Sequence, residues 1–131
     1  MFEPDFVTLD TDNIVISACQ ALHEDDGDLC GYYMRIENNS NDKIQILGKD
    51  LSLTDDKGNS YLQSEQGFKG EILELNPGEY FEFEDLMPVH SASAVLYGTC
   101  RIVKEKLNQV KDIKIPALEL FSNKIKPYAL N

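Results

Sequence analysis

Apolar and polar residues alternate with a period of two along much of this 131-residue chain, and this period constrains the fold more than any other feature. In the segments 14–18, 32–37 and 80–84, apolar residues recur at every second position and therefore share one face of the segment. Such alternation is typical of half-buried β-strands, and the chain shows no long segment with the helical 3.6-residue period. The sequence therefore predicts an all-β protein.

Turn-forming residues separate the alternating segments. The runs 24–28, 38–42 and 55–59 are rich in Asp, Asn and Gly, which stabilise turns through side-chain hydrogen bonds or through positive φ angles. About seven strands with this punctuation predict an antiparallel β-sandwich.

Three local features are predicted within the strands. Apolar residues change from even to odd positions across Gly48, so a β-bulge or a strand switch is expected there. The strand over 94–103 is expected to be buried on both faces at its start. The last strand, around Ile113 and Ile115, is expected to end at Pro116.

Chain length and charge limit the class of protein. We expect residues 1–131 to form one domain, with a core over about residues 12–120 and a C-terminal tail over 121–131. The 12 Lys and Arg residues against 23 Asp and Glu residues give a net charge of −11. Because this charge repels phosphate backbones and anionic lipids, we expect neither nucleic acid nor a membrane as a partner.

The cysteines and the first residues predict a cytoplasmic location. Cys19, Cys30 and Cys100 are odd in number and form no Cys-x-x-Cys pair, so reduced thiols are expected. Residues 1–5 carry acids and a proline instead of the basic and apolar pattern of a secretory signal.

The most distinctive motif is a loop bracketed by glycines, which we call the glycine loop: Gly67-Phe68-Lys69-Gly70-Glu71. Glycines with positive φ suit a loop that connects two strands. Glycines also line phosphate cradles, but these form at a helix N-terminus in a βαβ unit, and no such pattern is present. Glu65 and Glu71 flank Lys69 and oppose a pyrophosphate, so the structural role is favoured.

Other groups of reactive residues predict little chemistry. His23 and the acidic run 24–28 predict weak attraction of cations without the spacing of an EF-hand. His90 beside Ser91 is interpreted as a polar loop, because adjacent residues rarely form a nucleophile and base pair. We predict no catalytic residue, no metal site and no cofactor.

Three tyrosines are candidates for a binding surface. Tyr33, Tyr80 and Tyr97 would form an aromatic patch rimmed by acids if they shared an exposed sheet face. Packing of one or more of them in the core is an equally open alternative.

The order of these motifs resembles the ApaG family. The resemblance covers about residues 32–120 and includes the glycine loop, Pro77-Gly78-Glu79 with its following strand, and Gly98. It implies a sandwich of the immunoglobulin or fibronectin type III kind. It also implies protein binding, because ApaG domains occur as appended modules, or a link to divalent cations and dinucleoside polyphosphates. Family members often carry Gly-x-Gly-x-x-Gly, whereas Glu65 occupies the first glycine position here.

Together these features predict a non-enzymatic module that binds an unidentified protein partner through a sheet face and the glycine loop. The residues assigned to this role are Gly67, Phe68, Lys69, Gly70, Glu71, Tyr80 and Tyr97. The alternative is a small-ligand binder for a phosphorylated metabolite, such as pyrophosphate or a dinucleoside polyphosphate, or for a divalent cation. A weak homodimer is also left open.

Overall fold

A computed structural model describes residues 5–21, 29–68 and 70–122 and places nine β-strands and no helix in these ranges. The strands are β1 (Val7–Thr11), β2 (Ile14–Ala21), β3 (Leu29–Asn38), β4 (Ile44–Asp55), β5 (Ser60–Gln66), β6 (Leu73–Leu75), β7 (Tyr80–Pro88), β8 (Ser93–Lys104) and β9 (Gln109–Phe121). The count exceeds the expected number of about seven. One of the nine, β1, precedes residue 12, where the core was expected to begin.

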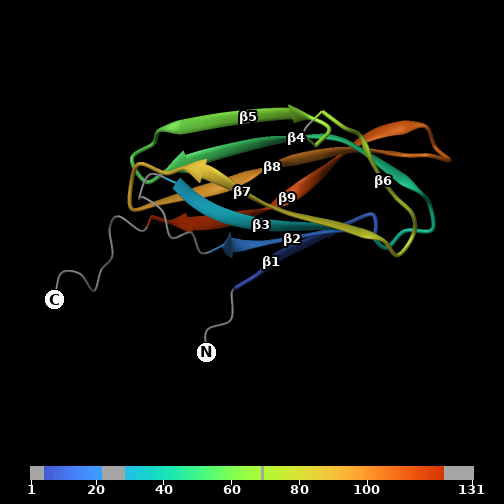
Figure 1. Ribbon diagram of the computed structural model, residues 1–131, viewed down its shortest axis with the longest axis horizontal. Coiled ribbons are helices and arrows are strands. Elements are labelled where there is room, and N and C mark those ends of the chain that lie inside the picture. The colour runs from blue at the N-terminus through green and yellow to red at the C-terminus, as the bar shows by residue number, and fades with distance from the viewer. Residues whose placement is uncertain (1–4, 22–28, 69, 123–131) are drawn as a thin grey trace.

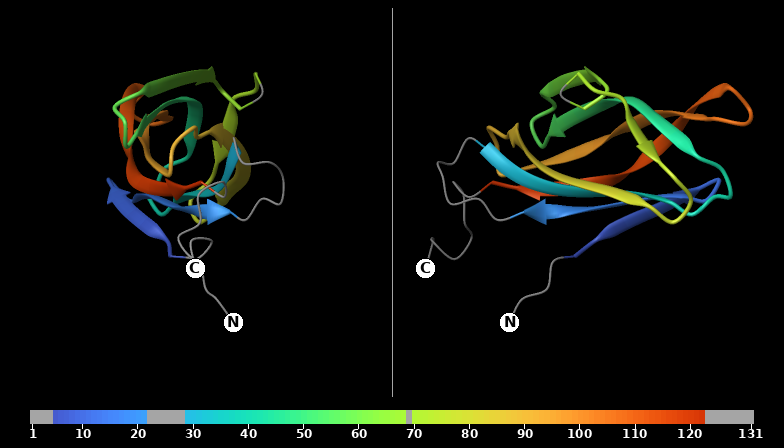
Figure 2. Two further views of the ribbon diagram at one scale, coloured as in Figure 1. Left: turned by 90° about the vertical axis from the view of Figure 1, so that its left-hand side faces the viewer. Right: turned by 45° about the vertical axis from the view of Figure 1, so that its right-hand side comes forward.

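The strands form two antiparallel sheets that pack face to face (Figure 1). The first sheet has the order β1-β2-β3-β7 and the second has the order β5-β4-β8-β9. The short β6 pairs with the beginning of β4, on the same side as β5, which pairs with the rest of β4. Figure 2 shows the two sheets curving around a common interior. The predicted antiparallel β-sandwich is confirmed.

Alternating side chains fill the space between the sheets. Tyr32, Met34 and Ile36 of β3 are buried, whereas the residues between them are partly exposed, as the period of two predicts. Val95 and Tyr97 of β8 are 37% and 41% exposed, so the expectation that this strand is buried on both faces at its start was wrong. The described residues provide no third layer to cover the outer face of the second sheet.

Two bulges interrupt the ladders of the second sheet. The register between β4 and β8 shifts between Ile46 and Gly48, which confirms the predicted bulge. A Cβ atom at Gly48 would clash with the carbonyl oxygen of Glu65, so only glycine fits there. The second shift lies between β8 and β9, where Leu118 faces Leu96 and Ile115 faces Gly98.

The second bulge explains why β9 does not end at Pro116, as the sequence had suggested. Proline lacks an N–H group, but a bulge leaves one residue without a ladder partner, so the strand continues to Phe121. The following Ser122 is buried. The rest of the expected tail, residues 123–131, lies outside the described residues. Within the described ranges, no helix is long and apolar enough to cross a membrane.

All three cysteines are buried and free, as expected for reduced thiols. Burial raises the pKa of Cys30, and burial together with the nearby Glu84 carboxylate raises the pKa of Cys19. Burial raises the pKa of Cys100 to about 12. A raised thiol pKa leaves little of the reactive thiolate at neutral pH.

We therefore predict that Cys100 reacts slowest in the folded protein at pH 8, by at least about two orders of magnitude relative to the unfolded chain. After unfolding in denaturant without reductant, all three cysteines are expected to react. Alkylation followed by peptide mass spectrometry measures each rate. A thiol that stays unreactive in the unfolded chain would contradict the assignment of free cysteines.

Candidate functional site

The glycine loop connects β5 to β6 and contains a tight turn. The N–H of Phe68 donates to the carbonyl of Glu71 at 2.7 Å, and the N–H of Glu71 donates to Phe68 at 3.1 Å. Gly67 and Gly70 have φ angles of +66° and +84°, which confirms the predicted need for positive φ. Lys69, the cationic candidate of this loop, lies outside the described residues.

The bulge in β4 anchors this loop. β5 and β6 pair with β4 on either side of the bulge, and the glycine loop spans the interval between them. The N–H of Gly67 donates to the carbonyl of Leu47, next to Gly48, at 2.6 Å. A Cβ atom at Gly67 would clash with the backbone of Glu71, whereas one at Gly70 would meet open space.

Phe68 attaches the loop to the first sheet. Its ring lies 4.9 Å and 5.1 Å from the rings of Phe81 and Phe83 on β7, measured between centroids. The ammonium of Lys49 lies 4.5 Å from the centroid of the Phe68 ring and 3.0 Å from a carboxylate oxygen of Glu65. Lys49 is only 2% exposed, so its charge is held by an ion pair and by aromatic faces. Phe68 therefore has a packing role.

A hollow of about 550 Å³ lies beside the loop. Its lining consists of Leu47, Gln66, Gly67, Gly70, Ile72 and Arg101. Arg101 is the cation that a phosphate would need, but its guanidinium already pairs with Asp50 at 2.5 Å. The N–H groups of Gly67, Phe68 and Glu71 are likewise used in hydrogen bonds within the protein. Among the described lining residues, the hollow therefore has one cation, which is already paired, and the three N–H groups named above are already bonded.

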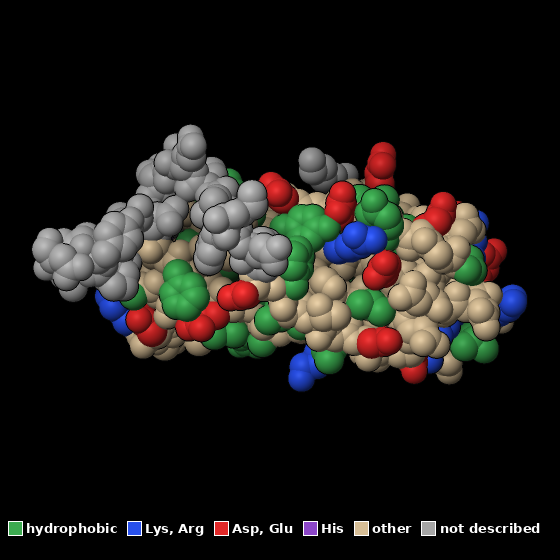
Figure 3. All heavy atoms as spheres, turned by 90° about the horizontal axis from the view of Figure 1, so that it is seen from below, with side chains coloured by type: hydrophobic (Ala, Val, Ile, Leu, Met, Phe, Trp, Pro, Cys, Tyr) green, Lys and Arg blue, Asp and Glu red, His purple; other side chains and the backbone are tan. Residues whose placement is uncertain are grey.

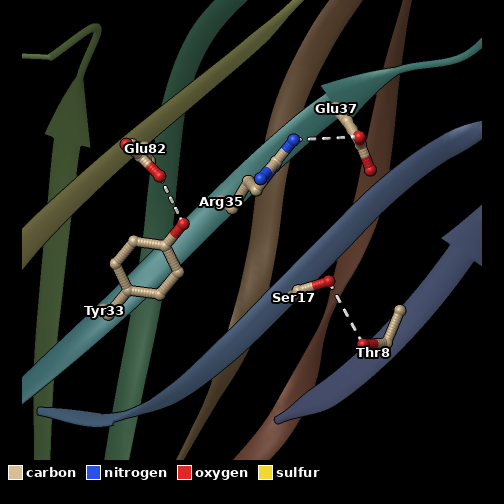
Figure 4. Close-up of polar contacts among 6 residues, drawn as sticks. All are labelled: Thr8, Ser17, Tyr33, Arg35, Glu37 and Glu82. Atoms are coloured by element: carbon tan, nitrogen blue, oxygen red, sulfur yellow. Dashed lines mark hydrogen bonds and ion pairs between the residues drawn. The ribbon is translucent and has the colours of Figure 1, made fainter.

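The outer face of the first sheet carries a cluster of polar and aromatic side chains. Tyr33 and Arg35 on β3 point out of the sheet, and the Tyr33 hydroxyl donates to a Glu82 carboxylate oxygen at 2.5 Å (Figure 4). Arg35 pairs with Glu37 at 3.2 Å, and its guanidinium carbon lies 3.7 Å from the centroid of the Tyr80 ring. We call Tyr33, Arg35, Glu37, Tyr80 and Glu82 the outer cluster.

A hydrogen bond to Glu82 holds the Tyr33 ring of the outer cluster in place, and stacking with Arg35 holds the Tyr80 ring. Partial burial and the Glu82 carboxylate raise the pKa of the Tyr33 hydroxyl, so this group stays protonated and donates at neutral pH. Tyr80 remains 49% exposed although Arg35 stacks on it. Rings that are held in place in this way lose little side-chain entropy when a partner covers them.

An apolar hollow of about 600 Å³ adjoins the outer cluster. Its lining includes Phe6, Cys19, Tyr33, Leu118 and Phe121, with carboxylates from Asp5, Glu84 and Glu119. The rings of Phe6 and Tyr33 meet edge to face at a centroid distance of 5.8 Å. Seen from the side of β1 and β2, separate hydrophobic patches alternate with acidic side chains (Figure 3).

The structure does not bring all of the predicted site residues together. Tyr80 lies at the start of β7, the strand whose Phe81 and Phe83 contact the glycine loop. Tyr97 lies on the outer face of the second sheet, where its hydroxyl is 3.1 Å from Thr54 Oγ1. The idea that Tyr33, Tyr80 and Tyr97 share one patch is therefore wrong for Tyr97, because β8 belongs to the other sheet.

The sequence also drew attention to an acidic segment and to Ser91. The acidic segment 23–28, proposed to attract cations weakly, lies outside the described residues. The described residues contain no group of three or more His, Cys, Asp or Glu side chains placed to hold a metal ion. Ser91 is buried, and its hydroxyl donates to the backbone carbonyl of Ser93 at 2.8 Å.

Sequence reasoning missed three cations that shape these sites. Lys49 faces the interior because the bulge at Gly48 reverses which side of β4 the following residues occupy. The predicted bulge could therefore have placed Lys49 in the interior. Arg35 alternates with buried residues of β3, so the sequence could have predicted that it lies on an outer face. Its stacking on Tyr80 could not be predicted, because it depends on the pairing of β3 with β7. Arg101 lines the same hollow as Gly67 and Gly70 because β8 pairs with β4, and no local pattern reveals this pairing.

Comparison with known proteins identifies the family. The profile of the ApaG domain matches residues 23–104, which is more than half of the chain. The chain belongs to the ApaG family. It is 28% identical to the Protein ApaG of Rhizobium etli over 103 residues, and this alignment covers 79% of this chain and 78% of that protein. It is 32% identical to the Protein ApaG of Beijerinckia indica over 91 residues, and this alignment covers 70% of this chain and 69% of that protein.

Solved structures support the fold of this ApaG-family chain. A crystal structure of a Bordetella pertussis protein named ApaA superimposes with a TM-score of 0.73 at 19% identity and covers 93% of this chain and 97% of that chain. An X-ray structure of a structural genomics target gives a TM-score of 0.76 at 17% identity and covers 90% of this chain and 92% of that chain. At these identities the likeness establishes the shared fold alone.

The two loop glycines allow a matched test of the loop's geometry. Both need positive φ, but only at Gly67 does a Cβ also clash with backbone. We predict that Gly67→Ala lowers the free energy of unfolding by about 2–4 kcal/mol and Gly70→Ala by about 1–2 kcal/mol. Urea denaturation measures both values. Equal losses for the two variants would show that the tight packing of Gly67 is not essential.

Proposed function

We propose that this ApaG-family chain is a non-enzymatic binding module whose outer cluster docks a protein partner. The observation that carries this proposal is the outer cluster itself, in which Tyr33, Arg35 and Tyr80 are fixed by hydrogen bonds and stacking. Tyr80 remains exposed, and Tyr33 and Arg35 remain partly exposed. Tyrosine and arginine are the residue types enriched at the centres of protein interfaces. The adjoining apolar hollow offers a pocket for a side chain of the partner.

The charge of this face indicates the chemistry of the partner. On the outer cluster and its neighbours, Arg35 is outnumbered by the carboxylates of Glu37, Glu82 and Glu84. The whole chain carries a net charge of −11, which steers cationic molecules toward it. The proposed partner therefore presents basic side chains around an apolar anchor. The apolar anchor enters the hollow beside Phe6 and Tyr33.

Other features support binding rather than catalysis. The hydroxyl of Ser91 donates to a backbone carbonyl instead of to a base. The carboxylate of Glu82 accepts the hydroxyl of Tyr33, a contact that orders the face. The proposed cytoplasmic location and the immunoglobulin-like character of the sandwich fit such a module.

We predict that the double variant Tyr33→Ala, Tyr80→Ala captures at least about tenfold less partner than the unmodified chain, because aromatic anchors dominate interface energies. The measurement is quantitative mass spectrometry of proteins retained by the tagged chain from a cell extract. Retention is also expected to fall as salt is raised, because screening weakens the attraction of a basic partner.

The matched control is Tyr97→Ala, which removes a tyrosine of similar exposure from the outer face of the other sheet. It should leave retention unchanged. Thermal unfolding of each variant shows whether the fold is intact. Loss of the partner in Tyr97→Ala together with full retention in the double variant would place the interface on the second sheet and overturn the proposal.

The second candidate function is binding of a phosphorylated metabolite in the hollow beside the glycine loop. The observation that favours it is Arg101, whose side chain lines the same hollow as Gly67 and Gly70. The observations against it are that the N–H groups of Gly67, Phe68 and Glu71 are already bonded and that Asp50 pairs with Arg101. We therefore rank this candidate below the protein-binding module.

We predict that pyrophosphate at millimolar concentration produces no saturable rise in the melting temperature of the unmodified chain, measured by thermal shift. A specific site would give such a rise by mass action. A saturable rise that Arg101→Gln abolishes, and that Lys114→Gln with the same change of charge retains, would promote the second candidate. Lys114 is exposed on β9 and does not line the hollow.

A further inference from the structure

The free edge of β5 has the features of a strand that pairs with another strand. β5 is the terminal strand of its sheet and pairs only with β4 in the described residues. The backbone N–H and C=O groups on its other side therefore have no ladder partner. Such a row is a template for adding a strand from another chain.

Hydrogen bonds within the β4–β5 hairpin show which residues face this edge. The N–H of Asp55 donates to the carbonyl of Asn59, and the N–H of Gly67 donates to the carbonyl of Leu47. In an antiparallel ladder such bonded pairs alternate with pairs whose groups point away. Since the register is unbroken between these bonds, the residues that point to the free edge are Ser60, Leu62, Ser64 and Gln66.

The other terminal strands carry the protection that natural proteins use against edge pairing, and β5 does not. The edge strand β7 contains Glu82, Glu84 and Pro88, and the edge strand β9 contains two lysines and Pro116. β1 and β6 are short. By contrast, β5 has the sequence Ser-Tyr-Leu-Gln-Ser-Glu-Gln, without proline or lysine, and Leu62 in it is 74% exposed.

We propose that the free edge of β5 binds β5 of a second copy of this chain, in antiparallel orientation about a two-fold axis at Gln63. This register pairs Ser60 with Gln66 of the second copy and Leu62 with Ser64 of the second copy. It uses all four residues that point to the edge. Two copies of Leu62 become diagonal neighbours on the outer face, which removes apolar surface from water.

The charges of the strand fit a second copy. The acidic residue of β5 is Glu65, which already pairs with the buried Lys49. In the proposed register Glu65 faces Tyr61 of the second copy, so no like charges are opposed. Gln63 Oε1 is buried without a hydrogen-bond partner, and the Gln63 amide of the second copy would supply a donor at the axis.

The size of the contact and the net charge set its strength. A single pair of seven-residue strands buries less surface than a standard stable interface. Two chains of charge −11 also repel each other. The dimer is therefore weak, and it strengthens when salt screens the repulsion.

Sedimentation equilibrium of the full chain tests this proposal. The average mass is expected to rise from 14.8 kDa toward twice that value with protein concentration, and more steeply when NaCl is raised from about 0.05 M to about 0.5 M. Leu62→Glu is expected to raise the dissociation constant at least about tenfold, because it sets two carboxylates beside each other. Ser64→Pro removes an N–H group that faces the edge, and it is expected to weaken the dimer similarly.

The matched control is Leu107→Glu, which makes the same change of charge at another exposed leucine, in the turn between β8 and β9. Its dissociation constant should equal that of the unmodified chain. Unfolding in urea confirms that each variant keeps the monomer fold. A constant mass of 14.8 kDa at up to about 1 mM protein in both salts, or a dimer unaffected by Leu62→Glu and Ser64→Pro, would overturn the proposal.

Discussion

The β-bulge at Gly48 is the constraint on which the second sheet and its loops depend. β4 pairs with three other strands, so a change of parity in β4 affects all of them. Before the bulge Ile44 and Ile46 face the core, and after it Lys49 and Leu51 do. Without the extra residue, the second half of β4 would turn its apolar side chains to solvent. Glycine is required because any Cβ there would clash with β5.

The bulge also turns a lysine inward, and this has a cost that its contacts must offset. Burying an ammonium group is unfavourable, and a buried ion pair often stabilises no more than apolar residues of the same shape. Lys49 is held by the Glu65 carboxylate and by the rings of Phe68 and Phe83. We interpret this cluster as fixing the position of the glycine loop against β7. The loop glycines then serve backbone geometry, and the N–H groups of Gly67, Phe68 and Glu71 are used in hydrogen bonds within the protein.

The sequence predicted the features that follow from local alternation, such as buried faces and the bulge. It missed the features that depend on which strands pair. Alternation identified the buried residues of β3, and the change of parity located the bulge at Gly48, because both follow from which side of a strand a residue occupies. The same logic could have found the shift in β9, where Ile113 and Ile115 are odd and Leu118 and Leu120 are even. Alternation shows that Tyr80 and Tyr97 face outward, but it cannot assign them to a sheet. Arg101 lies beside the hollow of the glycine loop because β8 pairs with β4, which the sequence pattern does not reveal.

The two proposed surfaces lie on different parts of the sandwich and can act together. The outer cluster belongs to β3 and β7 in the first sheet, whereas the proposed dimer edge belongs to β5 in the second sheet. A dimer through β5 therefore leaves both copies of the outer cluster accessible. A partner with two basic, apolar segments would bind the second cluster as an intramolecular event, with an effective concentration set by the linker between its segments. Even a weak dimer would then strengthen binding to such a partner, and by linkage the partner would strengthen the dimer.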